Sequence, residues 1–315
     1  MKLPFTFSLS LFFRLILPGF IVSLALFPAI YSFVGLFDFD IDAENIIIIF
    51  TIMCGWFFVV FDMHIYMLLE GRRYWPRLLL NLFLKHESQR LEKINNAYDK
   101  AVKDKDGRLY EELSVELRRF PIDEDTGNFV ANYPTRLGNL LAAYEQYPKT
   151  RYGMDSIFYW NRIWLAIDKD TRAMIDDQAA LVDSVVYVTA AFVIDGLIVL
   201  VYILLKWLFQ FNALYLPNTE TLFLLLFILP IIGYFSHHFS LHLHASYGDI
   251  FKSVFDIYRD RVSVDEVVDY IAELTKDGSF KNMSAEEKYC AAWMYLHNYR
   301  IKTKDGVKLV PEFDK

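Results

Sequence analysis

The hydrophobic positions of this chain are concentrated in four long runs, two in the first quarter and two in the last half. They cover Leu15–Leu36, Ile46–Leu69, Val186–Phe209 and Thr221–Leu241. A helix needs about 20 apolar residues to cross a hydrocarbon core roughly 30 Å thick, and each run is long enough. A surface helix of a soluble protein keeps a polar face, which these runs lack. Because backbone polar groups inside lipid must be paired within the segment, we predict four membrane-spanning α-helices.

The remaining sequence shows helical periodicity with a polar surface. Strand patterns are almost absent, so the fold class that we predict is all-α. No helix breaker separates Ala173–Val182 from the third span, which is therefore expected to continue outward as one long helix, and Asp249–Val262 is expected to extend the fourth span in the same way. The other expected helices are Leu84–Lys103, Leu109–Phe120, a helix that starts after Thr135 and ends at Pro148, Ser156–Ile167 capped by Asp155, Val264–Thr275 and Ser284–Tyr299.

The charges of the loops predict the orientation of the spans. The connection Phe37–Asn45 holds four acidic residues and no basic one, whereas Arg72, Arg73 and Arg77 follow the second span. Basic loops stay in the cytoplasm, so both termini and residues 71–183 are expected there. The predicted organisation is then residues 1–70 with two spans and a short interfacial N-terminal segment, residues 71–183 as a cytoplasmic helical domain, residues 184–244 with two spans, and residues 245–315 as C-terminal cytoplasmic helices.

Composition agrees with a membrane protein and indicates which classes of partner to expect. Hydrophobic residues make up 55% of the chain and aromatic residues 17%. The formal net charge of −7 argues against nucleic acid as a partner, and membrane lipids are expected instead. The two cysteines, Cys54 within a span and Cys290 near the C-terminus, are too far apart in predicted depth to form a disulfide.

Ionisable residues within the spans are costly and often functional. Asp195 lies near the middle of the third span beside Gly196, and it fits either an ion or proton pathway or a hydrogen bond between helices. Asp62 and His64 lie nearer the cytoplasmic end of the second span, where water or Arg72 can reach them. A structural role is the simpler interpretation for these two residues.

Four of the seven histidines lie at the end of the fourth span. They are His237, His238, His242 and His244. His238 and His242 are four residues apart on a helix, a spacing that can share one divalent metal ion. A pH-sensing role and a plain polar interface layer are the alternatives. No other cofactor is indicated.

Polar residues in the central segment suggest contacts at the membrane surface. Arg136 and Arg151 bracket one predicted helix, and Asp155 caps the next. Together with Arg72, Arg73 and Arg77 they fit either anchoring to anionic lipid head groups or holding the cytoplasmic domain in place. The alternative is a network of arginine and carboxylate groups within the protein that only stabilises the fold.

Two stretches resemble a known pattern. Residues 62–76 read D-x-x-I-Y-x-x-x-E-G-R followed by W-P, and residues 134–155 contain P-T-R-L-G-N and R-Y-G-x-D. Both resemble an uncharacterised family of multi-pass bacterial inner-membrane proteins. The resemblance implies the same architecture and the bacterial inner membrane as the location, and it brings no activity.

No motif of a known enzyme class is present, so a membrane-embedded metal-dependent enzyme is the least favoured hypothesis. The first hypothesis is a homo-oligomeric channel-like or membrane-permeability protein controlled by its cytoplasmic domain, with Asp195 around a shared axis. The second is a membrane-anchored sensor or scaffold that docks a cytoplasmic protein partner, for example within a signalling or defence system.

Overall fold

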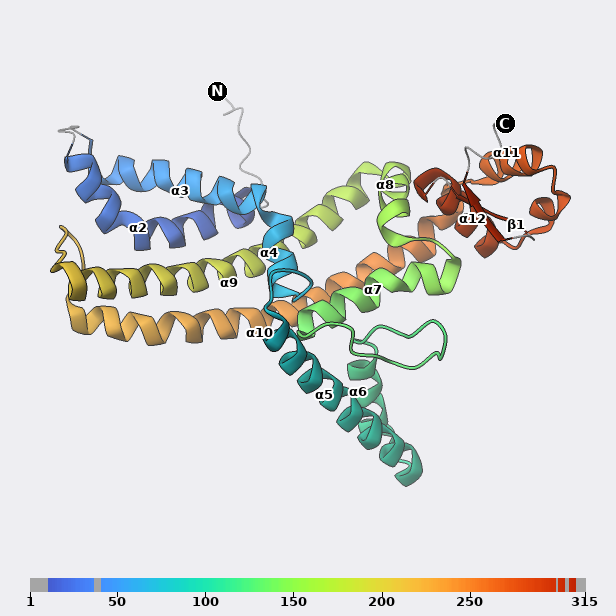
Figure 1. The fold of residues 1–315 in the computed structure, drawn as a ribbon, viewed down its shortest axis with the longest axis horizontal. Helices are drawn as coiled ribbons and strands as arrows, with labels where there is room; N and C mark the ends of the chain where they lie inside the picture. The colour runs from blue at the N-terminus through green and yellow to red at the C-terminus, as the bar shows by residue number, and fades with distance from the viewer. Residues whose placement is uncertain (1–10, 37–40, 299, 304–305, 310–315) are drawn as a thin grey trace. The chain divides into compact units, whose positions relative to one another are not determined.

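A computed structural model describes residues 11–36, 41–298, 300–303 and 306–309, and nearly all of its regular structure is helical (Figure 1). The predicted helical class is thus confirmed. The chain divides into two compact units, Met1–Trp75 with Ala173–Tyr247 and Pro76–Arg172 with Gly248–Lys315. Residues 1–10 of the expected interfacial segment and residues 37–40 of the acidic Phe37–Asn45 connection lie outside the described residues.

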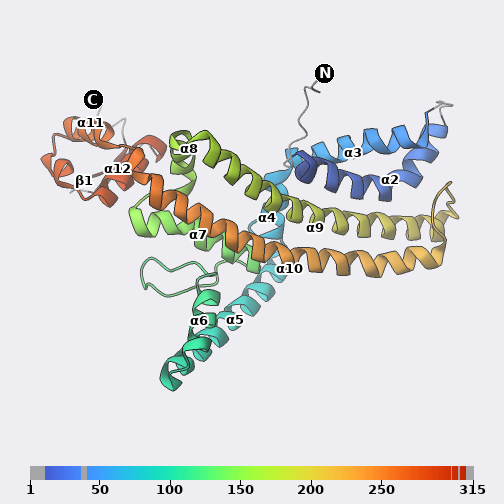
Figure 2. The same ribbon diagram turned by 180° about the vertical axis from the view of Figure 1, so that it is seen from behind.

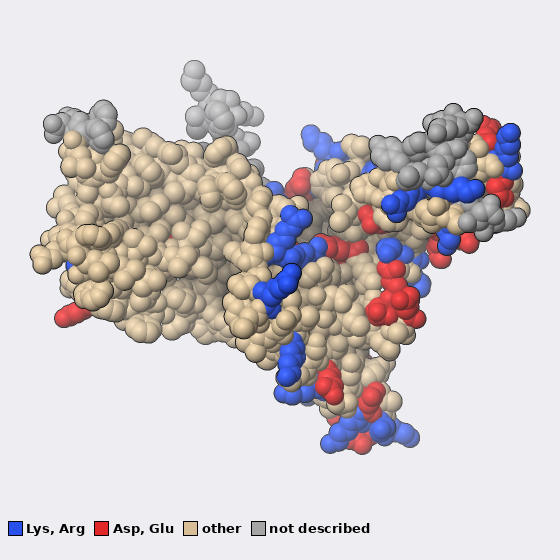
Figure 3. All heavy atoms as spheres, viewed as in Figure 1, with Lys and Arg blue, Asp and Glu red and all other residues tan. Residues whose placement is uncertain are grey.

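The first unit contains four helices that are long and apolar enough to cross a membrane, as the hydrophobic runs predicted. Figures 1 and 2 show α2 beside α3 and α9 beside α10. On the face shown in Figure 3, these helices present almost no charged side chains. Their bounds are α2 Leu17–Gly35, preceded by the π-helical turn η1 Phe12–Ile16, α3 Ala43–Val60, α9 Lys169–Phe209 and α10 Thr219–Tyr258.

Two glycines allow α2 and α3 to pack with their backbones in contact. A Cβ atom on Gly19 would lie 2.1 Å from the carbonyl oxygen of Thr51, and one on Gly55 would lie 2.1 Å from that of Leu15. Next to this crossing, the hydroxyls of Ser23 and Thr51 are 3.0 Å apart and buried. Small residues and interhelical hydrogen bonds are the usual means by which apolar helices associate within lipid.

The second hydrophobic run is not one continuous helix, which corrects the expectation for Ile46–Leu69. It is interrupted at Phe61, where φ is −96° and ψ is 13°, and continues as α4 Asp62–Leu69. Phe61 still donates its N–H to the carbonyl of Phe57 at 2.9 Å. The interruption is therefore a local kink, and it immediately precedes Asp62.

The helices α9 and α10 confirm that both later spans continue as single helices beyond the apolar runs. They contain 41 and 40 residues. α10 includes Pro230, whose ring packs near Gly196 of α9. A proline removes one helical hydrogen bond, and the helix nevertheless continues on both sides.

The second unit begins with a helical hairpin, where the helices Leu84–Lys103 and Leu109–Phe120 were expected. It consists of α5 Arg77–Asp104 and α6 Gly107–Leu117. Lys105 closes the turn in the left-handed conformation with φ of 55°, and the Asp106 side chain accepts a hydrogen bond from the N–H of Leu109 at 3.1 Å. Leu91, Leu117 and Phe120 form the buried core of this hairpin.

Helix α7 Arg136–Tyr152 starts as predicted but does not end at Pro148. The Thr135 side chain caps its first turn by accepting a hydrogen bond from the N–H of Gly138 at 3.0 Å. The true end is set by Gly153, which has φ of 68° and donates to the carbonyl of Lys149 at 2.9 Å. Because only one turn follows Pro148, the cost of its missing N–H is confined to the last turn of the helix.

Two later helices begin with side-chain caps, and the predicted cap at Asp155 is confirmed. Asp155 accepts a hydrogen bond from the N–H of Phe158 at 2.9 Å and starts α8 Ser156–Ala166. Ser284 and Glu287 form a reciprocal capping box before α12 Ala285–Asn298, with distances of 2.8 and 3.3 Å. The intervening elements are the short turn η2 Arg259–Arg261, α11 Asp265–Thr275 and the short turn η3 Gly278–Asn282.

The C-terminal region also contains a small hairpin that the sequence pattern did not predict. β1 Arg300–Thr303 pairs antiparallel with β2 Gly306–Leu309, with Arg300 opposite Leu309. Four-residue strands are too short to show a clear alternation of apolar and polar positions. A buried hydrogen bond joins α8 to α12, because the hydroxyl of Tyr159 donates to the carbonyl of Tyr289 at 2.6 Å. Burial raises the pKa of Tyr159.

Candidate functional site

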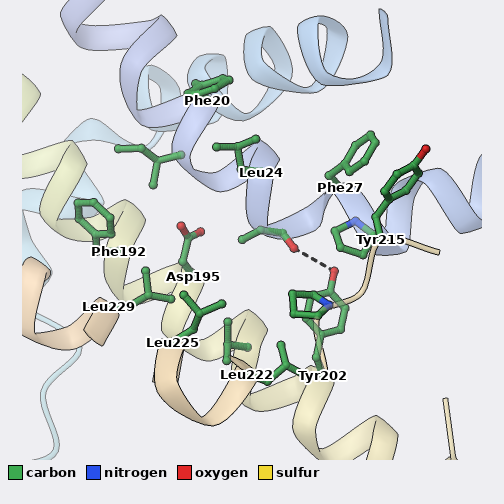
Figure 4. Close-up of a pocket in the computed structure, with 15 residues that line it drawn as sticks. Phe20, Leu24, Phe27, Phe192, Asp195, Tyr202, Tyr215, Leu222, Leu225 and Leu229 are labelled. Atoms are coloured by element: carbon green, nitrogen blue, oxygen red, sulfur yellow. Dashed lines mark hydrogen bonds between the residues drawn. The ribbon is translucent and has the colours of Figure 1, made fainter. Parts of the chain in front are cut away.

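A partly open pocket lies between α2, α9, α10 and the α9–α10 loop of the first unit (Figure 4). Its volume is about 410 Å³, within the usual range for small-molecule sites. The residues that line it are mostly aromatic or aliphatic: Phe20, Ile21, Leu24, Ala25, Phe27, Pro28, Phe192, Asp195, Val199, Tyr202, Tyr215, Pro217, Leu222, Leu225 and Leu229. Asp195 is the one charged residue in this lining.

The Asp195 carboxylate points into the pocket from α9 (Figure 4). The residue is only 4% exposed, and its Oδ1 atom has no hydrogen-bond partner among the described residues. A buried carboxylate without a protein partner is unfavourable, because desolvation of the charge is not compensated. The pocket therefore holds a polar group whose partner is not supplied by the described protein.

Aromatic side chains form the opposite part of the pocket. The Tyr202 hydroxyl donates to the carbonyl of Ala25 at 3.0 Å, so it is already engaged (Figure 4). The Tyr215 ring lies 5.4 Å from Phe27 and 5.1 Å from Tyr31, measured between ring centroids. These contacts hold the aromatic wall in position. The arrangement can bind a mainly apolar molecule with one polar or cationic group.

The pocket changes the interpretation of Asp195. The sequence indicated either a pathway or a hydrogen bond between helices, and no such bond occurs among the described residues. Asp195 faces a cavity lined by helices of its own chain, so its position does not require a second copy. The sequence pattern did not single out Phe20, Phe27 or Tyr215. The two phenylalanines look like any other aromatic residue of an apolar run, and Tyr215 lies in the loop between the third and fourth runs.

A separate group of polar side chains connects three elements of the first unit, η1, α4 and α9. The Arg14 guanidinium from η1 pairs with Asp183 of α9 at 2.6 Å, and the Tyr66 hydroxyl from α4 donates to the same carboxylate at 2.7 Å. The predicted residue Asp62 accepts a hydrogen bond from the Tyr187 hydroxyl at 2.7 Å. We call Arg14, Asp62, Tyr66, Asp183 and Tyr187 the polar cluster. Both carboxylates of the polar cluster have hydrogen-bond partners within the protein, and Arg14, the one cation of the cluster, pairs with Asp183. The structural interpretation of Asp62 fits these contacts and stays a prediction.

His64 and His244 have different surroundings. His64 is exposed, and its ring lies 5.7 Å from Phe61 and 6.1 Å from Tyr74. His244 is 1% exposed and lies at the edge of the polar cluster, with Nε2 3.4 Å from the Tyr66 hydroxyl. Its Nδ1 is 2.7 Å from the carbonyl of Ser240, which can only accept, so Nδ1 carries the hydrogen.

The four C-terminal histidines of the fourth run do not converge on one site. His238 and His242 are exposed neighbours with ring centroids 5.7 Å apart, and His237 is half-buried. Within the described part of the chain, no group of three or more His, Cys, Asp or Glu side chains is placed to hold a metal ion. A metal shared by His238 and His242 would need ligands from elsewhere, and it stays a prediction.

The predicted surface residues fall into two groups. Arg72 pairs with Glu70, and the Arg136 Nε atom lies 4.0 Å from Oε1 of the buried Glu87, so these two arginines fit the intraprotein network. The other predicted side chains form the second group, which is not part of that network in the contacts described. Asp155 caps α8. The remaining three are exposed arginines: Arg73, Arg77 and Arg151.

The second unit has a pocket of about 390 Å³ whose acidic lining is already engaged. Asp123 binds its own loop, and hydrogen bonds from Thr126 lower the pKa of its carboxyl. Glu124 pairs with Lys149 at 2.7 Å. Since Asp155, which also lines this pocket, caps α8, no carboxylate there is directed at a ligand.

Comparison with family models, curated proteins and solved structures finds no match to this chain. The resemblance of residues 62–76 and 134–155 to bacterial membrane proteins therefore stays a prediction. The features of the molecule that bear on its function are the pocket and its unpartnered carboxylate.

Proposed function

We propose that this protein is an integral membrane sensor, in which the four spans bind a small molecule in the pocket around Asp195. The single observation that carries the proposal is the buried, unpartnered carboxylate aimed into a pocket with apolar walls. The second unit, which we place in the cytoplasm, then responds to occupancy of the pocket and docks a protein partner. Location in a bacterial inner membrane, with both termini cytoplasmic, belongs to the same proposal.

The depth of the site supports binding from the bilayer. Asp195 lies nine residues into the run Val186–Phe209, which places it about 14 Å along a helix that rises 1.5 Å per residue. An aspartate at this depth costs about 2.5–3.5 kcal/mol on insertion scales. A bound molecule that pairs with the carboxylate offsets that cost. Since the described residues supply no partner for the Asp195 carboxylate, we infer that a ligand supplies it.

The helices that line the pocket also offer a route for the signal. α9 and α10 both contribute lining residues, and both continue without interruption past the first unit, into Lys169–Arg172 and Gly248–Tyr258. A change in their packing around the pocket therefore reaches residues of the second unit along a continuous backbone. Coupling requires that the ligand favours one of two helix arrangements.

Filling the pocket tests the proposal. We expect native mass spectrometry of the purified protein in nanodiscs to show a retained small molecule, and Leu225→Trp to abolish it. Leu224→Trp is the matched control, because Leu224 is 58% exposed and does not line the pocket. Leu225→Trp should also change hydrogen exchange in residues 248–258, whereas Leu224→Trp should not. Equal behaviour of the two variants in both measurements would contradict the proposal.

A homo-oligomeric channel is the competing hypothesis, and the same mass measurement separates it from the sensor. A channel requires several copies and an ion flux in liposomes that changes with Asp195→Asn. A sensor with a pocket in each chain requires neither. Detection of a stable multimer with Asp195-dependent ion conductance would favour the channel.

A further inference from the structure

We propose that the molecule bound beside Asp195 is a lipophilic amine, with a protonated nitrogen on the carboxylate and a hydrocarbon or aromatic body along the pocket. This inference rests on the proposed function, because it assigns the ligand class of the same site. It follows from charge, from the chemistry of the pocket walls and from the relative positions of the two.

The charge of the ligand follows from the protein groups present. Asp195 is the one charged residue that lines the pocket, and its Oδ1 atom has no hydrogen-bond partner among the described residues. Two cations of the membrane-spanning helices are already engaged, because Arg14 pairs with Asp183 and Lys206 donates to the carbonyl of Pro217 at 2.9 Å. An ammonium group would supply both a countercharge and hydrogen-bond donors.

The walls of the pocket determine the rest of the ligand. Leu24, Leu225 and Leu229 surround the carboxylate in Figure 4, and Phe27, Tyr202 and Tyr215 form the wall farther along. A hydrocarbon chain or an aromatic ring of the ligand would cover these apolar surfaces and exclude water from them. The aromatic rings of the wall also attract a nearby cation.

A zwitterionic lipid head group fits this pocket poorly. The phosphate that accompanies the amine in such a lipid would need its own donors, and no Lys, Arg or His side chain lines the pocket. Burial of an uncompensated anion next to Asp195 is doubly unfavourable. The favoured class is therefore an amine without a phosphate, such as a long-chain alkylamine or an amine attached to fused rings.

Two photoreactive probes that differ only at their head group test this assignment. Each carries a twelve-carbon chain with a diazirine near its end, and the head group is either a primary amine or a hydroxyl. The full-length protein in phosphatidylcholine nanodiscs is irradiated with each probe, and the labelled residues are mapped by mass spectrometry. We expect the amine probe to label the pocket, and dodecylamine to compete better than dodecanol.

Four variants separate the contributions of charge and cavity. Asp195→Asn should reduce labelling of the pocket by the amine probe at least tenfold and leave the hydroxyl probe nearly unchanged. Glu220→Gln, which neutralises an exposed carboxylate at the start of α10, should change neither. Leu225→Trp should block both probes, and Leu224→Trp should block neither. Thermal unfolding of each variant verifies that it is folded.

The failures of the two proposals differ in these experiments. If the amine probe labels Asp195→Asn as strongly as the wild type, while Leu225→Trp blocks labelling, the amine assignment is wrong and the pocket remains a binding site. If Leu225→Trp labels as well as Leu224→Trp, the pocket is not a binding site, and the proposed function fails with the inference.

Discussion

At the scale of single residues, the charged groups of the first unit differ in whether the protein compensates them. Asp183 receives two partners, Arg14 and Tyr66, and Asp62 receives the hydroxyl of Tyr187. Asp195 receives none from the described residues. A carboxylate held by an arginine and a tyrosine is typical of a group that stabilises a fold, whereas an uncompensated one in a cavity is typical of a binding site. This contrast is the reason for placing function at Asp195.

The sequence identified Asp195, Asp62 and His244 but not their surroundings. Acidic residues and histidines stand out within apolar runs because they are rare and costly there. Their partners do not stand out, since Tyr187 lies 125 positions from Asp62 and looks like an ordinary aromatic residue of a span. Such pairings depend on how the helices pack, and one sequence does not contain that information.

The pair of Arg14 and Asp183 gives a prediction at this scale. Arg14→Met leaves a partly buried carboxylate without its cation, and we expect it to lower the free energy of unfolding by about 1–3 kcal/mol. Asp183→Asn alone leaves the arginine unpaired and should cost a similar amount. The double variant removes both charges and should be more stable than the sum of the single effects predicts.

The measurement is thermal unfolding of the four proteins in the same detergent, followed by circular dichroism. Additive effects of the two substitutions would show that Arg14 and Asp183 are not coupled, and the polar cluster would then lose its structural role.

At the scale of elements, most helices were predictable and the points where helices bend or end were not. The runs of apolar residues predicted four spans, and the lack of breakers predicted that α9 and α10 continue beyond them. Phe61 and Pro148 show the limits of such patterns. The kink at Phe61 has no proline or glycine to mark it, whereas Pro148 marks an end that Gly153 provides five residues later.

The pocket was not predictable from the elements for a related reason. Phe20 and Phe33 both lie in the apolar helix α2, but only Phe20 lines the pocket and Phe33 is 61% exposed. Hydropathy treats the two residues alike. The difference arises from the way α2 faces α9 and α10, through contacts such as that of Tyr202 with Ala25, which are 177 positions apart.

The crossing of α2 and α3 provides a prediction for an element. Gly55→Ala places a methyl group where the Leu15 carbonyl oxygen lies, so the two helices must separate. We expect a loss of about 1–3 kcal/mol in unfolding free energy, the usual cost of overpacking. Gly35→Ala is the control, because nothing lies within 4 Å of the added atom. Equal thermal stability of the two variants would contradict the close crossing.

At the scale of the whole molecule, the sensor proposal requires a membrane that the helices of the first unit cross. The short loops of that unit would then lie on one side of the membrane and the second unit on the other. The structure contains four helices of suitable length and hydropathy, and their outward side chains are largely apolar. The orientation follows only from loop charges, with acidic residues around Asp42 and basic residues after the second span. A pocket ligand that enters from the bilayer signals inward only if the second unit lies in the cytoplasm.

Labelling of single cysteines in intact cells tests this orientation. In a background with Cys54 and Cys290 replaced by serine, Asp42→Cys and Asn218→Cys should react with a membrane-impermeant maleimide, because the loop charges predict that both loops face outward. Thr126→Cys lies on an exposed loop of the second unit and should react only after the cells are opened. That second reaction shows that its thiol is accessible, so absence of labelling in intact cells reports location. Labelling of Thr126→Cys in intact cells, with Asp42→Cys and Asn218→Cys unlabelled, would invert the topology and place the second unit outside.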